Sequence, residues 1–423
     1  MALSRHSILH YWDALYGVTP IVGGSPVFSR NGGATFQGRE RLGRTVVART
    51  PRQSWATLDG VRRPVLQLEP ARTNRLLYSE AFEQWYSTGS VTINSGFTDP
   101  FGGTAARLVG TSSNQAISLA QTLSAGLVAV SVFMRRSSGQ QYFGLYDLGS
   151  PGGWRCIVTV RWDSSGTPSL STAAGSGTLL PVEDWSGGWY RLGFLTTTST
   201  AGSHGAYLYP SGGLAAGDVF AFGYQVEEGP GVTGYIPTSG TPVSRTLETV
   251  HFSPAPAAQA LAVYQRLVVS IPSGSINGRF FSLGQATDGE LPRFLAYLNG
   301  SGNPAVYYQN SGGNTANSIS GISVESGDTL EILGILQADG SARGVFSRNG
   351  APVVVGNSPA GPTGGLSGAF GRVHMNSVGT AEVTAGRYAE LKIFKLADFF
   401  SGTDQGRMDE ARALVLGPSG DLL

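Results

Sequence analysis

Short runs in which hydrophobic and polar residues alternate dominate the middle of the chain. The alternation is clearest at residues 219–226, where it predicts that Phe220, Phe222, Tyr224 and Val226 share one buried face of a strand. Similar β-prone runs, each bounded by Gly, Ser, Pro or Asp, occur at residues 128–134, 141–145, 155–161, 189–196 and 206–209. Because no helical pattern separates them, we expect residues 76–246 to form antiparallel sheets packed face to face.

Residues 251–423 repeat this organisation. The candidate strands are 267–271, 278–284, 294–298, 305–309, 329–336, 342–346, 352–355 and 388–394. Asp339-Gly340 and Asn349-Gly350 are typical hairpin turns between them. The order of strands, followed by a predicted helix at 403–416, resembles the laminin-G and concanavalin-like lectin sandwiches, which predicts a second β-sandwich.

Residues 1–75 show neither pattern for long enough to predict a domain. Leu9, Trp12 and Tyr16 have the spacing of one short amphipathic helix, and an Arg-rich segment with paired glycines follows. Such a segment has too few apolar residues for its own core, so we expect an extended arm that packs on neighbouring subunits or on the next module. A solvated basic loop is the alternative. The predicted fold class is thus all-β, with an arm (1–75), two antiparallel sandwiches (76–246 and 251–423) and a linker at 245–265.

Composition narrows the class of protein further. A chain of 423 residues predicts two or three domains, and 61 glycines with only 13% charged residues fit short strands joined by tight turns. The net charge of +1 argues against nucleic-acid binding. Cys156 is the single cysteine, which excludes an internal disulfide framework. We expect synthesis in a cytoplasm and no membrane insertion, because neither a signal peptide nor a long apolar stretch is recognisable.

Three segments of residues 68–245 carry a family resemblance. The first is LEPARTNRLLYSEAFEQW at 68–85, the second is GGWYRLGF at 187–194, and the third ends in GYIPTSGTPVSR at 234–245. Together they resemble tailed-phage virion proteins, in which an N-terminal segment leads into a jelly roll like those of carbohydrate-binding modules. The resemblance implies a non-enzymatic head or tail appendage in the virion. It also implies attachment to other virion proteins through the N-terminal arm, and a homo-oligomer that is a trimer in the family.

The residues of these segments also have a physical interpretation that needs no ligand. Glu69 and Arg72 are close enough in sequence to pair with one another or to clamp the opening and closing strands of the module, and Asn74 would fix a turn by bonding to backbone groups. Pro237 keeps the residue before it extended. We therefore predict structural roles at this junction for Glu69, Arg72, Asn74, Trp189, Arg191, Tyr235 and Pro237.

Two sets of residues are candidates for sugar binding, because flat aromatic rings stack on sugars while neighbouring polar groups bond to hydroxyls. In the first sandwich the set is Trp154, Trp185 and Asp147, with Tyr142 and Tyr146 nearby. In the second sandwich it is Tyr307, Tyr308 and Asn310. In both cases the competing interpretation is that the aromatic side chains fill the core or cover loops.

Catalytic chemistry finds little support. The closest carboxylates, Glu183 with Asp184 and Glu227 with Glu228, are adjacent in sequence and would point to opposite faces of a strand. No cofactor is implied, although Asp99, followed by Pro100, is where a structural calcium ion would be sought; a turn-capping carboxylate is the alternative. Three hypotheses follow: a structural virion appendage, a receptor-binding lectin for a host surface glycan, and, least favoured, a glycan-degrading enzyme.

Overall fold

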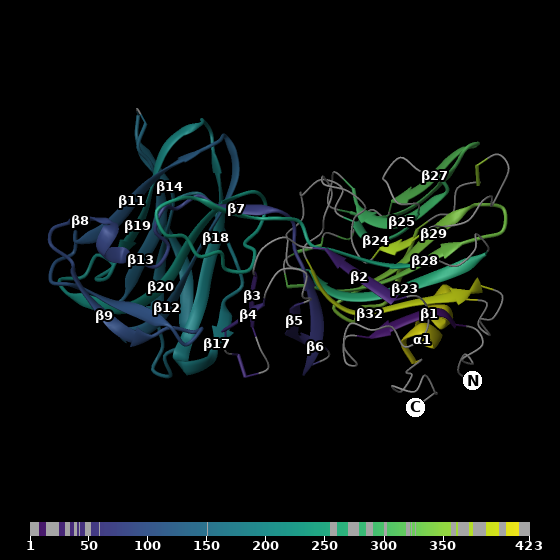
Figure 1. Cartoon of the computed structure of the whole chain (residues 1–423), viewed down its shortest axis with the longest axis horizontal. Helices are drawn as coiled ribbons and strands as arrows, with labels where there is room; N and C mark the ends of the chain where they lie inside the picture. The colour runs from purple at the N-terminus through teal and green to yellow at the C-terminus, as the bar shows by residue number, and fades with distance from the viewer. Residues whose placement is uncertain are drawn as a thin grey trace. The chain divides into compact units, whose positions relative to one another are not determined.

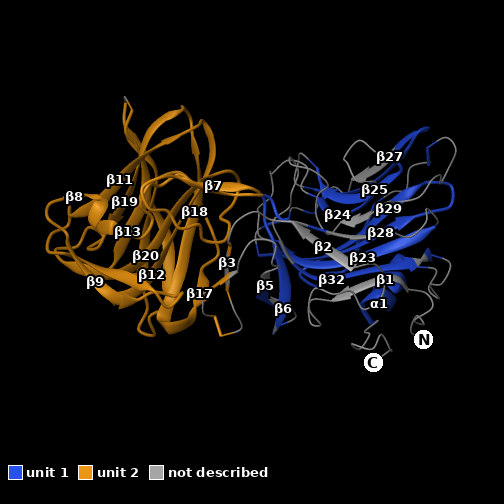
Figure 2. Ribbon diagram, in the orientation of Figure 1, with its two compact units in different colours: residues 1–31, 48–70, 247–423 blue, residues 32–47, 71–246 orange. Residues whose placement is uncertain are grey.

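The computed structural model divides into two compact units (Figure 2). Unit 1 contains residues 1–31, 48–70 and 247–423, and unit 2 contains 32–47 and 71–246. The described residues are 8–13, 25–29, 34–37, 40–41, 43–46, 52–58, 60–149, 151–253, 260–269, 279–284, 291–299, 303–318, 322, 324–325, 327–356, 361–362, 372–374, 386–396 and 403–413. Within them, no helix is long and apolar enough to span a bilayer.

Unit 2 is a sandwich of two antiparallel sheets (Figure 1). The nine-stranded sheet contains β16 (Thr178–Leu179), β18 (Trp189–Thr198), β12 (Gly126–Ser138), β20 (Gly217–Glu228), β10 (Thr104–Gly110) and β9 (Thr92–Thr98), together with β17 (Glu183–Trp185), β7 (Arg72–Asn74) and β21 (Val243–Arg245). The six-stranded sheet contains β15 (Pro168–Gly175), β14 (Gly153–Trp162), β13 (Gln141–Asp147), β19 (Gly202–Tyr209), β11 (Ala116–Leu123) and β8 (Tyr86–Thr88). A separate hairpin joins β3 (Ala34–Gln37) to β4 (Gly43–Val46). The all-β class and the sandwich architecture are confirmed.

Alternation along β20 is interrupted by a bulge. Register with β12 shifts by one residue between Phe222 and Gln225, and Gly223 has a φ of +59°, a conformation that favours glycine. As a result Phe220 and Phe222 lie on the outer face of the sheet, whereas Tyr224 packs in the core between the sheets. The prediction that these alternate residues share one face was therefore wrong, because an inserted residue reverses the alternation.

Unit 1 also consists of two antiparallel sheets around one core. The eight-stranded sheet contains β30 (Val354–Val355), β29 (Ala342–Arg348), β28 (Thr329–Leu336), β23 (Leu261–Val269), β32 (Gly386–Lys395), β6 (Val61–Leu68), β5 (Arg52–Leu58) and β1 (Ile8–Asp13). The seven-stranded sheet contains β2 (Ser25–Ser29), β22 (Thr249–Ser253), β31 (Arg372–His374), β24 (Arg279–Gly284), β25 (Arg293–Leu298), β26 (Pro304–Asn310) and β27 (Gly313–Ser318). The predicted hairpin turns at Asp339-Gly340 and Asn349-Gly350 connect β28 to β29 and β29 to β30.

The N-terminal strands belong to these sheets. β1 pairs with β32, where the spacing of Leu9, Trp12 and Tyr16 had predicted a helix; for Leu9 and Trp12 that prediction was wrong, and Tyr16 lies outside the described residues. β6 pairs with β32 and β5, and β2 pairs with β22. Where the sequence predicted an extended arm, β1, β2 and β6 pair with strands of the C-terminal half of the chain, whereas β5 pairs with β6 and β3 pairs with β4. Local spacing carries no sign of partners so distant in sequence.

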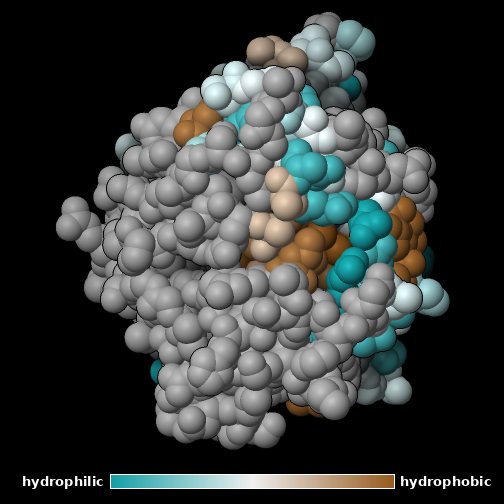
Figure 3. Space-filling model, turned by 90° about the vertical axis from the view of Figure 1, so that its right-hand side faces the viewer, coloured by the Kyte–Doolittle hydropathy of each residue, from teal (hydrophilic) through white to brown (hydrophobic). Residues whose placement is uncertain are grey.

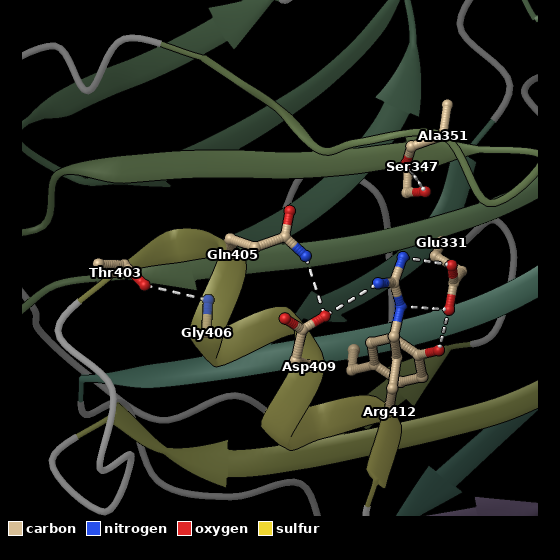
Figure 4. A network of polar contacts seen from close by, with 9 residues as sticks. Glu331, Ser347, Ala351, Thr403, Gln405, Gly406, Asp409 and Arg412 are labelled. Carbon is tan, nitrogen blue, oxygen red and sulfur yellow. Dashed lines mark hydrogen bonds and ion pairs between the residues drawn. The ribbon is translucent and has the colours of Figure 1, made fainter.

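The predicted C-terminal helix is present as α1 (Asp404–Ala413); residues beyond 413 lie outside the described ones. Met408 and Ala411 pack against the eight-stranded sheet. Arg412 donates to both carboxylate oxygens of Glu331, at 2.9 and 2.6 Å, and Figure 4 shows its guanidinium between Glu331 and Asp409. The buried ammonium of Lys392 donates to the carbonyl of Ala411 at 2.9 Å, so the last turn of the helix is anchored by a charged side chain.

The described surface mixes hydrophilic and hydrophobic residues. Figure 3 shows one face of the molecule, on which a small group of hydrophobic residues has hydrophilic neighbours. Among the exposed apolar residues of unit 1 are Val354 and Val355 of strand β30, at 39% and 40% exposure. β30 has only two residues, and so short an edge strand offers few backbone groups for pairing with another chain.

Candidate functional site

Five aromatic side chains lie on the outer face of the six-stranded sheet of unit 2. Tyr142 and Tyr146 come from β13, Trp154 from β14, and Tyr207 and Tyr209 from β19, and all five are half-buried. On β13 and β19 they alternate with buried residues that face the core, such as Phe143, Leu145 and Leu208, which they leave on the opposite side of the sheet. We call these five residues the aromatic face.

The rings of the aromatic face contact one another across three strands. The ring centroids of Tyr146 and Trp154 are 5.1 Å apart, and those of Trp154 and Tyr207 are 5.4 Å apart, both edge to face. Tyr207 and Tyr209 are stacked at 18° with 6.1 Å between centroids, and Tyr142 lies 6.3 Å from Tyr209. Mutual packing of this kind holds the rings in place before any ligand arrives.

Glycines lie between the rings of the aromatic face, so no side chain projects there. Gly205 is in register with Tyr146, and a Cβ at Gly205 would lie 2.6 Å from Cε2 of Tyr207, so the glycine lets that ring cover the sheet. Gly144 is in register with Tyr207, and its own Cβ would lie 2.6 Å from the carbonyl oxygen of Cys156. A side chain at either position would displace a neighbour, so the aromatic rings are the highest part of this region.

The surface continues to the edge of the sheet. Tyr86 on β8 is in register with Ser118 on β11, which is in register with Tyr207. Tyr86 therefore lies on the same side of the sheet, and it is 73% exposed. From β8 to β14 there are four strand spacings, which corresponds to a width of about 19 Å. A ligand longer than one sugar ring fits across this width.

Charge is scarce on the aromatic face. Asp147, at the end of β13, is buried, and its carboxylate accepts hydrogen bonds from Arg155 and from the backbone N–H of Gly149. The Arg155 guanidinium and this N–H hold the pKa of Asp147 below its ordinary value. Burial raises the pKa of the Tyr209 hydroxyl, so it stays protonated at neutral pH. The predicted Trp154 and Asp147 are thus near in the fold, but the carboxylate is already engaged.

The third residue of that predicted set, Trp185, is elsewhere. It is 5% exposed and packs on the outer face of the nine-stranded sheet, with its ring 5.0 Å from that of Phe133 and 5.4 Å from that of Phe101. The sequence placed Trp154 and Trp185 together, whereas the structure puts them on opposite sheets. Tyr207 and Tyr209 were missed as site residues; their alternating positions in β19 were the available signal.

Several of the predicted junction residues are buried and bond to backbone groups of neighbouring segments. Asn74 is fully buried; its amide donates to the carbonyl of Ile236 at 2.8 Å, and its Oδ1 accepts from the N–H groups of Val226 and Leu76 at 3.1 and 3.3 Å. β7, which contains Asn74, pairs with both β20 and β21. This side chain therefore joins the first strand of the sandwich to its closing segment.

The other junction residues also contact neighbouring side chains and backbone groups. The Tyr235 hydroxyl donates to Glu80 at 2.8 Å, and the indole N–H of Trp189 donates to the carbonyl of Thr98 at 3.2 Å. Arg191 is buried, with its guanidinium 5.3 Å from the Phe133 ring centroid. Arg72 is half-buried and donates to the carbonyl of Ala71. Pro237 is exposed. Glu69 is buried in unit 1, where the side chain of Gln67 donates to its carboxylate.

The set predicted in unit 1 is also divided. Tyr308 is fully buried in the core, whereas Tyr307, its neighbour on β26, is half-buried on the other side of the sheet. The Tyr307 hydroxyl and the Arg293 guanidinium both donate to Gln309 at 2.8 Å, and Arg293 lies 5.2 Å from the Tyr307 ring centroid. Asn310 is buried and accepts from the N–H of Gly312, as a turn residue would.

Asp99, the position predicted for calcium, has backbone partners. Its Oδ1 accepts from the N–H groups of Phe101 and Gly103, at 2.5 and 3.0 Å, and a Cβ at Gly103 would lie 2.6 Å from Oδ2. This geometry is that of a carboxylate capping a tight turn. Within the described part of the chain, no cluster of three or more His, Cys, Asp and Glu side chains could hold a metal ion.

No family model matches the chain, and no curated protein matches it in sequence. Among solved structures, the native heptameric SAP-like pentraxin from Limulus polyphemus is 21% identical, covering 34% of this chain and 67% of its own, with a TM-score of 0.26. The N-terminal CBM22-1–CBM22-2 tandem domain from Paenibacillus barcinonensis Xyn10C is 10% identical, covering 76% of this chain and 98% of its own, with a TM-score of 0.23. With both TM-scores below 0.5, the fold is defined by the strand pairing of this chain: an all-β protein of two sandwiches.

Proposed function

We propose that this chain is a non-enzymatic glycan-binding protein of a tailed-phage particle, and that the aromatic face binds the glycan. The observation that carries the proposal is the set of five half-buried rings on one outer sheet face, with Gly144 and Gly205 between them. Sugar rings stack on such aromatic surfaces through their C–H faces. The five aromatic side chains carry no charge of their own at neutral pH, which favours a neutral glycan.

The resemblance of residues 68–245 to phage virion proteins supports the location. We propose that the protein is made in the host cytoplasm, that its N-terminal part attaches to other virion proteins, and that it assembles as a homo-oligomer. Mass analysis of purified particles tests this part separately. Failure to find the chain in assembled particles would reject the virion role and leave glycan binding to be judged by itself.

A glycan array probed with the full chain tests the binding function. We expect wild-type binding to at least one neutral glycan, and a loss of about tenfold or more when Trp154 or Tyr207 is replaced by Ala, since stacked rings dominate such contacts. Tyr190→Ala is the matched control, because Tyr190 is half-buried in the same unit but packs against the core beside Trp162. Equal losses in all three variants would indicate disturbed folding and contradict the proposal.

A purely structural appendage is the second candidate. It is favoured by Trp185 and Tyr308, whose burial shows that part of the aromatic content serves packing. Absence of binding to every glycan on the array, with the chain present in particles, would select it. An enzyme is the least supported alternative, and release of reducing sugar from host envelope by the purified chain is the result that would reinstate it.

A further inference from the structure

The outer face of the nine-stranded sheet of unit 2 carries a second row of aromatic and polar side chains. In the strand register, Arg135 of β12 is opposite Trp189 on one side and Phe220 on the other. Phe220 is opposite Arg107 of β10, which is opposite Asn94 of β9. Trp189 is buried, Arg135, Phe220 and Arg107 are half-buried, and Asn94 is exposed. The row thus opens toward solvent at the β9 edge.

The guanidinium of Arg135 is held by rings alone. Its Cζ lies 4.2 Å from the ring centroid of Phe220 and 5.2 Å from that of Trp189, which are cation–π distances. Among the residues that the structure describes, none forms a hydrogen bond or an ion pair with this guanidinium. Partial burial lowers the pKa of Arg135, yet an arginine remains cationic at neutral pH. The result is a fixed positive charge whose N–H donors have no acceptor among the described residues.

Arg107, in the same row, provides the contrast. Its Nε donates to Asp218 at 2.5 Å, and Ser137 and Ser138 donate to the same carboxylate. Asp218 is therefore committed to Arg107 and does not neutralise Arg135. Between the two guanidiniums lies the half-buried ring of Phe220, which Phe97 of β9 contacts edge to face at 4.8 Å. The row thus places the Phe220 ring beside the Arg135 guanidinium, whose positive charge Asp218 does not balance.

We infer that the row formed by Arg135, Phe220, Arg107 and Asn94 binds a sugar residue that carries a carboxylate, such as a uronic acid in an acidic polysaccharide. A planar guanidinium binds a carboxylate through two parallel hydrogen bonds. The Asn94 amide would bond to a sugar hydroxyl. This row and the aromatic face are on opposite sheets, so the inference does not depend on the proposed function.

Calorimetric titration of the full chain with oligosaccharides of galacturonic, mannuronic and glucuronic acid tests the inference. We expect saturable binding of at least one, little binding of its neutral methyl ester, and weaker binding at high salt. Arg135→Gln should reduce the affinity about tenfold or more, since a charge-assisted contact is lost, and Arg135→Lys should reduce it less. Arg136→Gln is the matched control, because the exposed Arg136 donates to the carbonyls of Asp163 and Ser164 instead.

Several results would overturn the inference. They are no binding of any of the three acidic oligosaccharides, equal binding of the methyl ester, or an unchanged affinity in Arg135→Gln at an unchanged melting temperature. Tighter binding of a Glu-rich peptide would identify an acidic protein as the occupant, and a change of oligomeric mass in Arg135→Gln would identify a subunit contact. Trp154→Ala should leave acidic-sugar binding intact; its loss there would place the ligand on the aromatic face.

Discussion

The two outer faces of unit 2 are both rich in aromatic residues, but the described rings differ in how deeply they are buried. On the six-stranded sheet the five rings of the aromatic face stay half-buried. On the nine-stranded sheet, Phe101, Trp185 and Tyr235 pack on Phe133 and Phe222 and close that surface. The same side-chain chemistry thus serves packing in one place and is available for binding in the other.

The connecting segments decide which aromatic side chains are covered. The cover is provided by the turn after Asp99, by β17 and by the segment around Tyr235, each held by local hydrogen bonds such as those of Asp99 and Asn74. Arg135, Phe220 and Arg107, farther along the same face, are only half-buried, and Asn94 on β9 is exposed. Four predictions follow from this contrast.

The largest expected effect is on the closed side. Trp185→Ala removes a buried ring from between Phe101 and Phe133 and should lower the free energy of unfolding of unit 2 by about 3–5 kcal/mol. Trp154→Ala, on the open side, should cost less than half of this, since Trp154 is only half-buried. Urea unfolding followed by near-ultraviolet circular dichroism measures both. Equal losses would show that the two faces are equally part of the core.

Asn74 connects the closing segment to the sandwich. Asn74→Ala leaves the backbone groups of Ile236, Val226 and Leu76 without this partner and should lower the free energy of unfolding by about 2–4 kcal/mol. Ser244→Ala is the control, because the exposed Ser244 bonds only to the Thr73 hydroxyl and should change it by less than about 0.5 kcal/mol. A small effect in Asn74→Ala, measured in the same way, would refute its junction role.

Charge on the nine-stranded side predicts a pH dependence. Burial alone would raise the pKa of Asp218, but hydrogen bonds from Ser137, Ser138 and Arg107 outweigh it and keep this pKa below its ordinary value. The folded state therefore binds the proton less tightly than the unfolded state, and the stabilisation is present above about pH 4 and lost as the pH falls further. We expect the stability difference between wild type and Asp218→Asn to shrink below about pH 4 in denaturant unfolding; a difference that grows there would contradict this sign.

The smallest effect is expected at the edge of the open face. Tyr86→Ala should leave the free energy of unfolding within about 0.5 kcal/mol of wild type, since the side chain is 73% exposed. Affinity for the neutral glycan found on the array should fall about threefold to tenfold if the ligand reaches β8. Calorimetric titration measures this change. An unchanged affinity would restrict the ligand to the strands from β11 to β14.

Much of the fold could be predicted from the sequence because strands leave a local signal. The runs at 141–145, 155–161 and 189–196 are all strands, as alternation and turn residues indicated. Failures occurred where the deciding partner is distant or a residue is inserted. β1 is a strand because β32 supplies its hydrogen bonds, and Phe222 turns outward because a bulge precedes Tyr224. The sequence predicted Trp154, Tyr142 and Tyr146 of the candidate site. It did not predict Tyr207 and Tyr209, because β19 is distant in sequence from β13, with which it pairs.

The sequence alone indicates the all-β class, two sandwiches, a C-terminal helix, and part of the aromatic residues of the proposed binding surface. These depend on side-chain periodicity and turn chemistry, which act between neighbours in the chain. The tertiary structure leaves Trp154 half-buried and Trp185 buried, binds Asp147 to Arg155, and gives the Arg135 guanidinium no hydrogen-bond acceptor among the described residues. These properties depend on which strands become neighbours and which segments fold over them, and such long-range contacts have no fixed spacing in sequence.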